Sequence, residues 1–293
     1  MGTIGGIDHT VVMAESLEEA TLTAHRLGFR TTPPAAHPFG TANVLVQLQG
    51  GYLEFLAILD ESLFPEETPD RFSFPSFNRD FLIGEGAGLS LVALKTDDPE
   101  ALRERLAADG LTRGPTFSFE RTALSPEGRE LPVAFTLVFA THPELVRAGV
   151  FALVHRHPPE NFWHAAYQAH PNTARAMRGI TLVSPHIERT AEIFASITGI
   201  APSKTAGRVE ITLPDGSTLD IVDAATFERR FGSNAFSDKV LARFAAMTIE
   251  VDSLETAAST LTASGVPFET WEGAIVVAPE HAGGVGYRFI SAD

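Results

Sequence analysis

The fold of this chain is decided by the stretch GIDHTVVMAESLEEA at residues 6–20. Its first eight residues alternate in hydropathy as a strand does. The helix that follows has a capping pattern at Ser16 and Glu19 and a stop at Gly28. The stretch FAAMTIEVDSLETA at residues 244–257 repeats this pattern. At an offset of 237 residues, five residues recur without a gap, namely Ser16, Leu17, Glu18, Ala20 and Gly28.

Two weaker copies of the pattern lie between these. A strand and a helix are expected at residues 89–110 and again at residues 179–199, and each helix ends near a glycine. Short alternating runs separated by turn residues follow every helix. The repeat unit is therefore a strand, a helix and three further strands. It occurs four times, so the sequence predicts an α+β fold.

Composition and charge exclude several classes of function. The 22 basic and 37 acidic side chains give a formal net charge of −15, and no lysine or arginine cluster occurs, so a nucleic-acid partner is not expected. The chain has no cysteine, which excludes disulfides and thiolate metal sites. No apolar run approaches the ~20 residues of a membrane span, and the N-terminus lacks signal-peptide features. We therefore expect no membrane contact and a cytoplasmic location.

Alternation predicts which side chains lie together. Ile7, His9 and Val11 share one face of the first strand, and Tyr52 and Glu54 share one face of a later strand. A glutamate in an apolar strand is costly unless it is paired or bound to a ligand. His9 and Glu54 are therefore the expected polar pair of the N-terminal half.

Four motifs add a family resemblance to the repeat. They are GIDH at residues 6–9, HPFGTAN at 37–43, YLEF at 52–55 and HPPENFW at 157–163. With them the chain resembles the vicinal oxygen chelate superfamily, which is built of βαβββ modules, and within it the bacterial glyoxalase-like domain proteins. The resemblance implies that modules pair into curved sheets, each wrapped around a cup whose floor carries the active site.

This resemblance implies two cups in one chain. Modules one and two form the first cup at residues 1–157, and modules three and four form the second at residues 177–293. Residues 158–176 link them. Only the first cup is expected to be an active site.

Metal ligands in this superfamily come from the first and last strands of each module. In module one these positions hold His9 and Glu54, and in module two the first position holds Ser90. We expect His155 as the third ligand of a divalent ion, which is zinc, nickel, manganese, cobalt or iron. The second cup offers Asp220 without a histidine. We therefore expect no metal there, and a structural or dimerisation role.

The third ligand depends on strand register. Aligning Gly51 with Gly149 turns both His155 and His157 to the face opposite the cup. A bulge or a one-residue slip is needed to bring either of them inside. The alternative is a Glu54 that is satisfied by neighbouring side chains without any metal.

Other residues are expected to shape a substrate pocket at the rim of the first cup. Arg121 lies beside a hairpin turn, where it could bind a substrate carboxylate in a bidentate manner. Residues 63–83 form an expected loop with five phenylalanines, which is either a lid over the cup or part of an interface. The expected substrate-binding residues are His37, Thr41, Asn43, Arg121, His157 and Trp163.

The resemblance favours an enzyme that acts on a small molecule. A divalent ion held by His9, Glu54 and His155 would chelate two adjacent substrate oxygens and stabilise an enediolate in a lyase or isomerase reaction. His9 and Glu54 are the expected catalytic residues. The same ligands also suit the iron(II) of a ring-cleaving dioxygenase, which is one alternative. A metal-free protein that sequesters a small molecule is the other, and a homodimer is compatible with all three.

Overall fold

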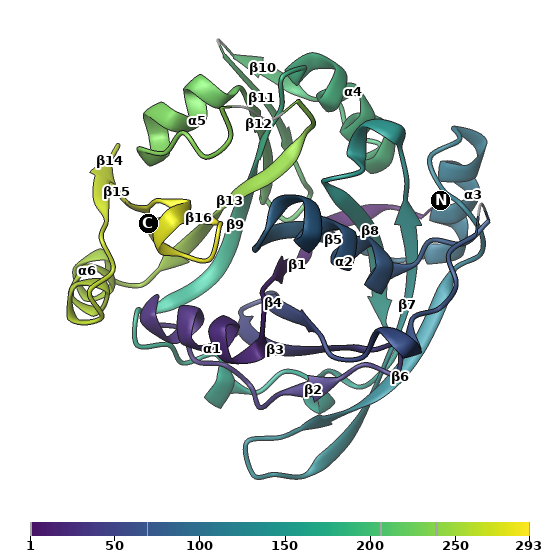
Figure 1. The fold of residues 1–293 in the computed structure, drawn as a ribbon, viewed down its shortest axis with the longest axis horizontal. Coiled ribbons are helices and arrows are strands. Elements are labelled where there is room, and N and C mark those ends of the chain that lie inside the picture. Colours follow the sequence, from purple (N-terminus) through teal and green to yellow (C-terminus); the bar gives the residue numbers. More distant parts are fainter. Residues whose placement is uncertain (1, 69, 206, 238–239, 293) are drawn as a thin grey trace.

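The computed structural model describes residues 2–68, 70–205, 207–237 and 240–292 and contains two eight-stranded sheets. In Figure 1 the first sheet lies at the lower right and the second at the upper left. The first half consists of β1 (Ile4–Met13), α1 (Leu17–Arg26), β2 (Ala35–Ala36), β3 (Thr41–Leu48), β4 (Gly51–Ile58), η1 (Glu61–Leu63), α2 (Phe74–Glu85), β5 (Gly88–Thr96), α3 (Pro99–Ala108), β6 (Phe117–Leu124), β7 (Glu130–Ala140), η2 (Pro143–Leu145) and β8 (Gly149–His155). After η3 (Pro159–Asn161) and η4 (Ala165–Tyr167), the second half consists of β9 (Ala174–Val183), α4 (Ile187–Thr198), β10 (Ser203–Thr205), β11 (Arg208–Thr212), β12 (Thr218–Val222), α5 (Ala224–Phe231), β13 (Arg243–Val251), α6 (Leu254–Ala263), β14 (Glu269–Trp271), β15 (Ala274–Val277), η5 (Pro279–His281) and β16 (Gly286–Ser291).

Each sheet consists of two modules joined edge to edge. The strand order is β2-β3-β4-β1-β5-β8-β7-β6 in the first sheet and β10-β11-β12-β9-β13-β16-β15-β14 in the second. The central pairs β1–β5 and β9–β13 are antiparallel, whereas the first strand of every module runs parallel to its last strand. This is the predicted arrangement of βαβββ modules, and the α+β fold with paired cups is confirmed.

The helix signals in the sequence act as predicted. The Ser16 side chain accepts a hydrogen bond from the Glu19 backbone N–H at 3.1 Å and caps α1, and Gly28 follows the helix with a φ of 82°. In the fourth module, Ser253 caps α6 through the backbone N–H of Thr256 at 3.1 Å. The gapless repeat in the sequence therefore corresponds to a repeat in structure.

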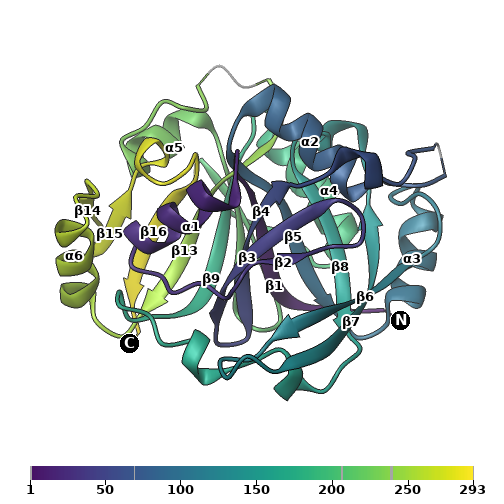
Figure 2. The same cartoon turned by 60° about the horizontal axis from the view of Figure 1, so that its bottom comes forward.

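The phenylalanine-rich stretch at residues 63–83 is not a loop throughout. Its second half forms α2, which begins after the N-cap Ser73 and has Pro75 in its first turn. Figure 2 shows α2 above the strands of the first sheet. Phe81 is fully buried in the apolar cluster of the first cup, and Phe74 lines its cavity. Packing of these aromatic rings on the cup stabilises a helix that the sequence pattern does not predict.

A bulge changes which residues of β1 face the first cup. The register of β1 with β5 shifts between Ile7 and His9. Ile7 belongs to the core outside the cup, so the expectation that it shares the face of His9 is wrong. Val11 and Tyr52 belong to the apolar cluster inside the cup, as alternation predicts. Asp8, the residue at the shift, is buried beside His9.

The last strand of module two is shifted by one residue from its glycine-based alignment. Leu153 belongs to the apolar cluster inside the cup, whereas Ala152, which the alignment equates with Glu54, belongs to the core outside it. The alignment is therefore wrong by one residue. His155, two residues beyond Leu153, lies on the cup side of β8.

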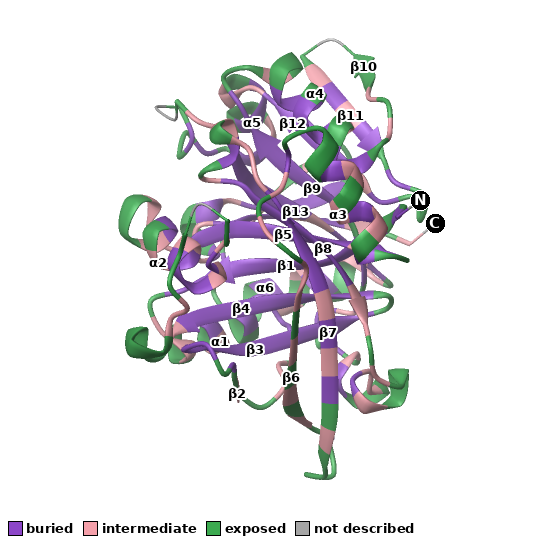
Figure 3. Cartoon of the chain, turned by 90° about the vertical axis from the view of Figure 1, so that its right-hand side faces the viewer, coloured by how far each residue is buried: buried purple, intermediate pink, exposed green. Residues whose placement is uncertain are grey.

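One hydrophobic core joins the two halves. The sheet faces turned away from the cups pack with the helices into a cluster that runs from Ile4 to Phe289. Phe29 contacts Phe289 with 6.2 Å between ring centroids, and the Thr10 hydroxyl donates to the sulfur of Met247 at 3.3 Å. Figure 3 shows most strands buried, whereas the β6–β7 hairpin is half-buried and exposed in turn. Within the described residues, no helix is both long and apolar enough to cross a membrane.

Candidate active site in the first cup

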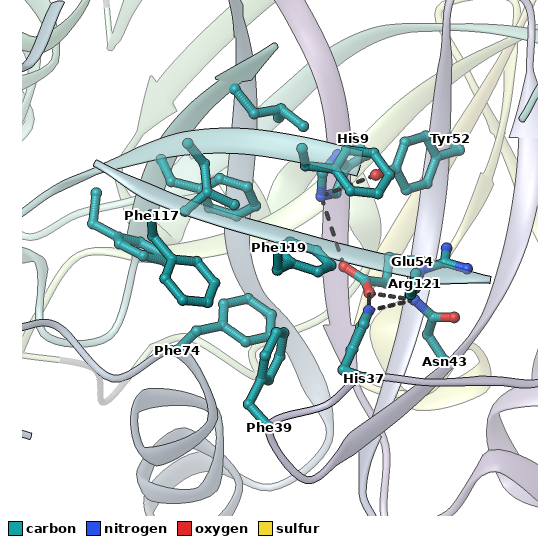
Figure 4. Close-up of a pocket in the computed structure, with 15 residues that line it drawn as sticks. His9, His37, Phe39, Asn43, Tyr52, Glu54, Phe74, Phe117, Phe119 and Arg121 are labelled. Atoms are coloured by element: carbon teal, nitrogen blue, oxygen red, sulfur yellow. Dashed lines mark hydrogen bonds and ion pairs between the residues drawn. The ribbon is translucent and has the colours of Figure 1, made fainter. Parts of the chain in front are cut away.

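The polar side chains of the first cup converge from separate elements. His9 comes from β1, Asn43 from β3, Glu54 from β4, Arg121 from the edge strand β6, and His37 from the turn before β3. Figure 4 shows them meeting at one end of a cavity. The remaining walls of this cavity are largely apolar and consist of Phe39, Phe74, Phe117, Phe119, Phe135, Leu137, Phe139, Phe151 and Leu153.

Glu54 is the centre of this polar group. Its Oε1 accepts a hydrogen bond from Asn43 Nδ2 at 2.6 Å and lies 3.7 Å from His37 Nε2. Its Oε2 lies 3.7 Å from His9 Nε2. The side chain is only 7% exposed, so a carboxylate here depends on these partners. The structure thus brings together the predicted pair of His9 and Glu54, and His37 joins it.

His37 is held as a neutral imidazole. Its Nε2 accepts a hydrogen bond from Asn43 Nδ2 at 3.2 Å, so the ring proton resides on Nδ1, which lies 2.8 Å from the Thr41 hydroxyl. Burial lowers the pKa of His37 to about 3, and the nearby charges of Arg121 and His9 act in the same direction. The side chain is therefore an uncharged hydrogen-bonding group near neutral pH.

Asp8 orients His9 from the side opposite the cavity. Its Oδ1 lies 2.7 Å from His9 Nδ1, and its Oδ2 lies 3.2 Å from His155 Nε2. Burial alone would raise the pKa of this carboxyl, but hydrogen bonds from His155 and His9 outweigh burial and hold the pKa well below its usual range. Because an ionised Asp8 accepts the Nδ1–H of His9, the Nε2 lone pair of His9 faces the cavity.

Tyr52 completes the floor of the site. Its ring stacks on His9 with 4.2 Å between centroids, and its hydroxyl lies 3.5 Å from His9 Nε2. Burial, and then the carboxylates of Asp8 and Glu54, raise the pKa of Tyr52 well above its usual value, so the hydroxyl stays protonated. Sequence reasoning gave neither Asp8 nor Tyr52 a role. The available signal was their position beside His9 and Glu54 in two of the quoted motifs.

Arg121 points into the cup mouth without an acidic partner. Among the described residues, no carboxylate lies within ion-pair distance of its guanidinium, and its hydrogen bond goes to the Thr122 carbonyl at 3.3 Å. Burial lowers the pKa of Arg121, and the nearby Tyr52 and Glu54 oppose this shift. A half-buried guanidinium in this state is a ready partner for a ligand carboxylate.

Two cavities meet at His37, Asn43 and Arg121, which line both of them. The inner cavity shown in Figure 4 is tight, with about 40 Å³ of space for the centre of a water molecule. The outer groove lies between β2, β3 and β6 and offers about 510 Å³. A molecule that enters through the groove therefore meets the polar group before it meets the apolar walls.

The other predicted substrate-binding residues lie outside the inner cavity and the outer groove. Thr41 is fully buried and accepts from His37. His157 accepts a hydrogen bond from the Ala134 backbone N–H at 3.0 Å. The Trp163 ring packs on the apolar cluster of the first cup, with 4.9 Å between its centroid and that of the Phe162 ring. Each of these three side chains contacts a residue that lines the inner cavity, namely His37, Phe135 or Tyr52.

The donor groups are not arranged as the predicted metal centre of His9, Glu54 and His155. His155 bonds to Asp8 on the far side of His9 and does not reach Glu54. The imidazoles of His9 and His37 approach different oxygens of the Glu54 carboxylate, so the three groups do not converge on one point. Across the described residues, no group of three histidine, aspartate or glutamate side chains could hold a metal ion.

Module two adds no further donor at this point. Ala93 stands opposite His9, and the residues of β8 that line the cavity are the apolar Phe151 and Leu153. Ser90, which the sequence places at a ligand position, bonds instead to the Asn78 side chain at 2.6 Å. The residues present therefore do not fit the metal ion that the superfamily implies, and the chemistry of the site is derived from these side chains alone.

The fold has counterparts among solved structures at low sequence identity. A hypothetical protein from Staphylococcus aureus is 11% identical with full coverage of both chains and a TM-score of 0.65. A mutant of 4-hydroxymandelate synthase from Streptomyces coelicolor is 13% identical over 99% of this chain and 93% of that one, with a TM-score of 0.61. A fusion of a xylose isomerase-like TIM barrel and 4-hydroxyphenylpyruvate dioxygenase is 12% identical over 99% of this chain and 49% of that one, with a TM-score of 0.61. Such likeness shows the fold alone.

Family comparison gives a more direct result. A glyoxalase-like domain family matches residues 7–198, which is more than half of the chain and includes all of the first cup after the start of β1. No curated protein matches the sequence. Together with the paired βαβββ modules, the match means that the chain belongs to the glyoxalase-like domain family of the vicinal oxygen chelate superfamily.

Proposed function

We propose that the first cup is the active site of an enzyme that transfers a proton on a small carbonyl substrate with adjacent oxygens, in an isomerase-type reaction. The orientation of His9 carries this proposal. Asp8 Oδ1 is hydrogen-bonded to His9 Nδ1 at 2.7 Å, and His9 Nε2 faces the cavity beside Glu54. A carboxylate that holds an imidazole in this way is the arrangement of a general base.

His9 Nε2 removes a proton from the carbon next to the substrate carbonyl. The electron pair of the broken C–H bond moves to the carbonyl oxygen, and the resulting enolate accepts a hydrogen bond from the Tyr52 hydroxyl. The imidazolium lies between the carboxylates of Asp8 and Glu54, which stabilise its charge. Return of the proton to a different atom of the substrate completes the isomerisation.

The two cavities support one class of substrate. A carboxylate on the substrate pairs with Arg121 where the groove meets the inner cavity, and an apolar or aromatic part faces the phenylalanine walls. Because the inner cavity is tight, entry of a ring requires half-buried side chains such as Phe117 to rotate. Phenylpyruvate carries a carboxylate, an adjacent carbonyl oxygen and a ring, so it is a suitable probe.

Hydrogen exchange in D₂O tests the proposal. The loss of the phenylpyruvate C3 proton signal is followed by ¹H NMR, and the rate without protein is subtracted. We expect acceleration by the native protein and its loss in His9→Asn and Glu54→Gln. Arg129→Gln changes an arginine whose side chain is 72% exposed in the β6–β7 turn, and it is the matched control that keeps the rate. Equal rates in the native protein and His9→Asn would contradict the proposal.

The metal-dependent functions that the sequence predicts are tested in the same assay. We expect exchange to survive treatment with EDTA, and elemental analysis to find no stoichiometric metal. Exchange that is lost with EDTA and restored by zinc, nickel, manganese or cobalt would replace the proposal with a metal-dependent lyase or isomerase. Oxygen consumption on a catechol after loading with iron(II) would replace it with a ring-cleaving dioxygenase.

Sequestration of a small molecule is a second candidate, and the apolar lining of the inner cavity favours it. Phenylalanine and leucine side chains form nine of its fifteen lining residues. A sequestering protein binds phenylpyruvate saturably without accelerating exchange. His9→Asn would then leave the affinity unchanged, whereas Arg121→Gln would lower it. A comparison of the native protein with these two variants therefore separates the two functions.

A further inference from the structure

The second cup contains a basic cavity that the proposed reaction does not use. The helix α5 fills one half of this cup, where Phe227 and Phe231 pack against Val222 and Ala246. Figure 1 shows α5 beside the strands of the second sheet. The other half is a cavity of about 240 Å³. Its charged lining consists of Arg178, Arg208, Arg230, Arg288, Asp220 and Glu272. This concentration of arginine occurs in a chain with a formal net charge of −15.

Asp220 fixes two of these arginines in place. Its Oδ1 accepts a hydrogen bond from Arg208 Nε and its Oδ2 accepts one from Arg230, both at 2.6 Å. The Asp220 side chain is buried, so both guanidiniums are held against the cavity wall before any ligand arrives. Arg208 also pairs with Glu210 at the edge of the cup. Among the described residues, Asp220 is the only carboxylate that pairs with Arg230, and it also pairs with Arg208.

Arg178 is not available in the same way. Its Nε donates to Glu250 at 2.6 Å, and the Arg178 side chain is 43% exposed. Its charge is therefore balanced by a carboxylate of the neighbouring strand. This leaves the centre of the cavity to the other arginines.

Arg288 is the guanidinium left for a ligand. Within the described part of the chain it makes no hydrogen bond, and no carboxylate lies within ion-pair distance. Glu272 and Asp220 act on it only through space, as do the like charges of Arg230 and Arg208. A half-buried guanidinium beside two others is electrostatically unfavourable unless an anion joins them.

We propose that this cavity binds a small organic carboxylate. The planar forks of Arg288 and Arg230 receive the carboxylate oxygens, since guanidinium groups match carboxylates in bidentate geometry. Thr181 and Thr248 line the same cavity and supply hydroxyl groups. The half-buried ring of Trp271 provides an apolar wall for the rest of the ligand. This site is independent of the reaction proposed for the first cup.

NMR of the full chain labelled with ¹⁵N tests this proposal. The chain has two tryptophans, so it gives two indole N–H signals, and Trp163→Phe identifies the signal of Trp271. We expect benzoate to shift the Trp271 signal saturably. Arg288→Gln should weaken this binding about tenfold or more, because it removes the charge-assisted hydrogen bonds. Arg129→Gln changes the net charge equally and should leave the affinity unchanged.

Two further probes separate carboxylate recognition from general anion binding. Acetate lacks the apolar part and should bind more weakly than benzoate, and inorganic phosphate should give no saturable shift. Benzoate and phosphate acting equally would overturn the proposal, and so would an undiminished response in Arg288→Gln. The absence of a saturable Trp271 shift in the native protein would overturn it without reliance on any variant. Each of these results is read at Trp271 and leaves the test of the first cup unaffected.

Discussion

Asp8 and His9 are consecutive residues whose side chains are hydrogen-bonded to each other at 2.7 Å. In a regular strand consecutive side chains point to opposite faces, so this contact depends on the register shift between Ile7 and His9 in β1. The bulge places a carboxylate behind the imidazole instead of in the core. One irregular residue thus prepares His9 for its proposed role as a base.

Replacing Asp8 with asparagine should disable His9 without removing it. The amide can donate to Nδ1 of His9, which would move the ring proton to Nε2 and leave no lone pair towards the cavity. We expect phenylpyruvate exchange to fall about tenfold or more. The ¹⁵N shifts of the His9 ring should show the change of tautomer. Asp252→Asn, at an exposed carboxylate that pairs with Arg175, is the control. An Asp8→Asn protein with unchanged exchange would refute the role of Asp8.

His37 should make the protein less stable in acid. Its pKa is lowered to about 3 in the folded state, whereas the unfolded chain takes up the proton near the ordinary value of 6.5. The stabilising effect of a neutral His37 is complete above pH 6.5 and decreases as the pH falls from there towards 3. Over this range the free energy of unfolding should fall by about 1.4 kcal/mol per pH unit from this group.

The variant His37→Gln should flatten this dependence. Urea unfolding between pH 4 and about pH 7 measures it, and the difference between native protein and variant isolates the contribution of His37. His25 is exposed on α1, so His25→Gln should keep the native slope. Identical slopes in the native protein and His37→Gln would show that His37 is not buried as a neutral group.

Arg121→Gln should act on binding more than on proton transfer. The guanidinium contacts the carboxylate of the substrate in the ground state and in the transition state alike, so its loss raises KM about tenfold or more and changes kcat less. Steady-state exchange rates over a range of phenylpyruvate concentrations give both constants. A fall in kcat at unchanged KM would place Arg121 in the chemical step instead.

Gly40 should be essential to the turn that presents His37. Its φ is 84°, and a Cβ there would lie 2.1 Å from the Asp60 carbonyl oxygen. Gly40→Ala should lower the free energy of unfolding by about 2 to 4 kcal/mol, through backbone strain and a clash with backbone. Gly216 is a matched control with a φ of 83° and open space around its Cβ, so its alanine variant should lose only about 1 kcal/mol. Equal losses in the two variants, measured by urea unfolding, would contradict the clash.

The fold could be predicted from the sequence because its signals are local and repeated. Capping residues such as Ser16 and Ser253 stand at the same place in modules one and four, and they cap helices in the structure. Glu54 could be predicted because a glutamate in an apolar strand needs partners. His37 was expected at the rim, and it proves to contact Glu54.

The remainder of the site escaped prediction because strand alternation fails at bulges. Asp8 follows Ile7 in a regular pattern, and nothing in the sequence marks the shift that brings it beside His9. Alignment by glycines likewise misplaced β8 by one residue and hid the apolar Leu153. The helix α2 escaped because its stability comes from burial of rings such as Phe81, which is a tertiary effect.

The core shared by the two halves has a consequence for how the protein responds to its ligands. Because the cluster runs from Ile4 to Phe289, neither cup keeps its outer face covered when the other unfolds, and a single cooperative melting transition should result. A ligand bound to either cup then raises the melting temperature of the whole molecule. The thermal stability of each cup therefore depends on whether the other cup is occupied.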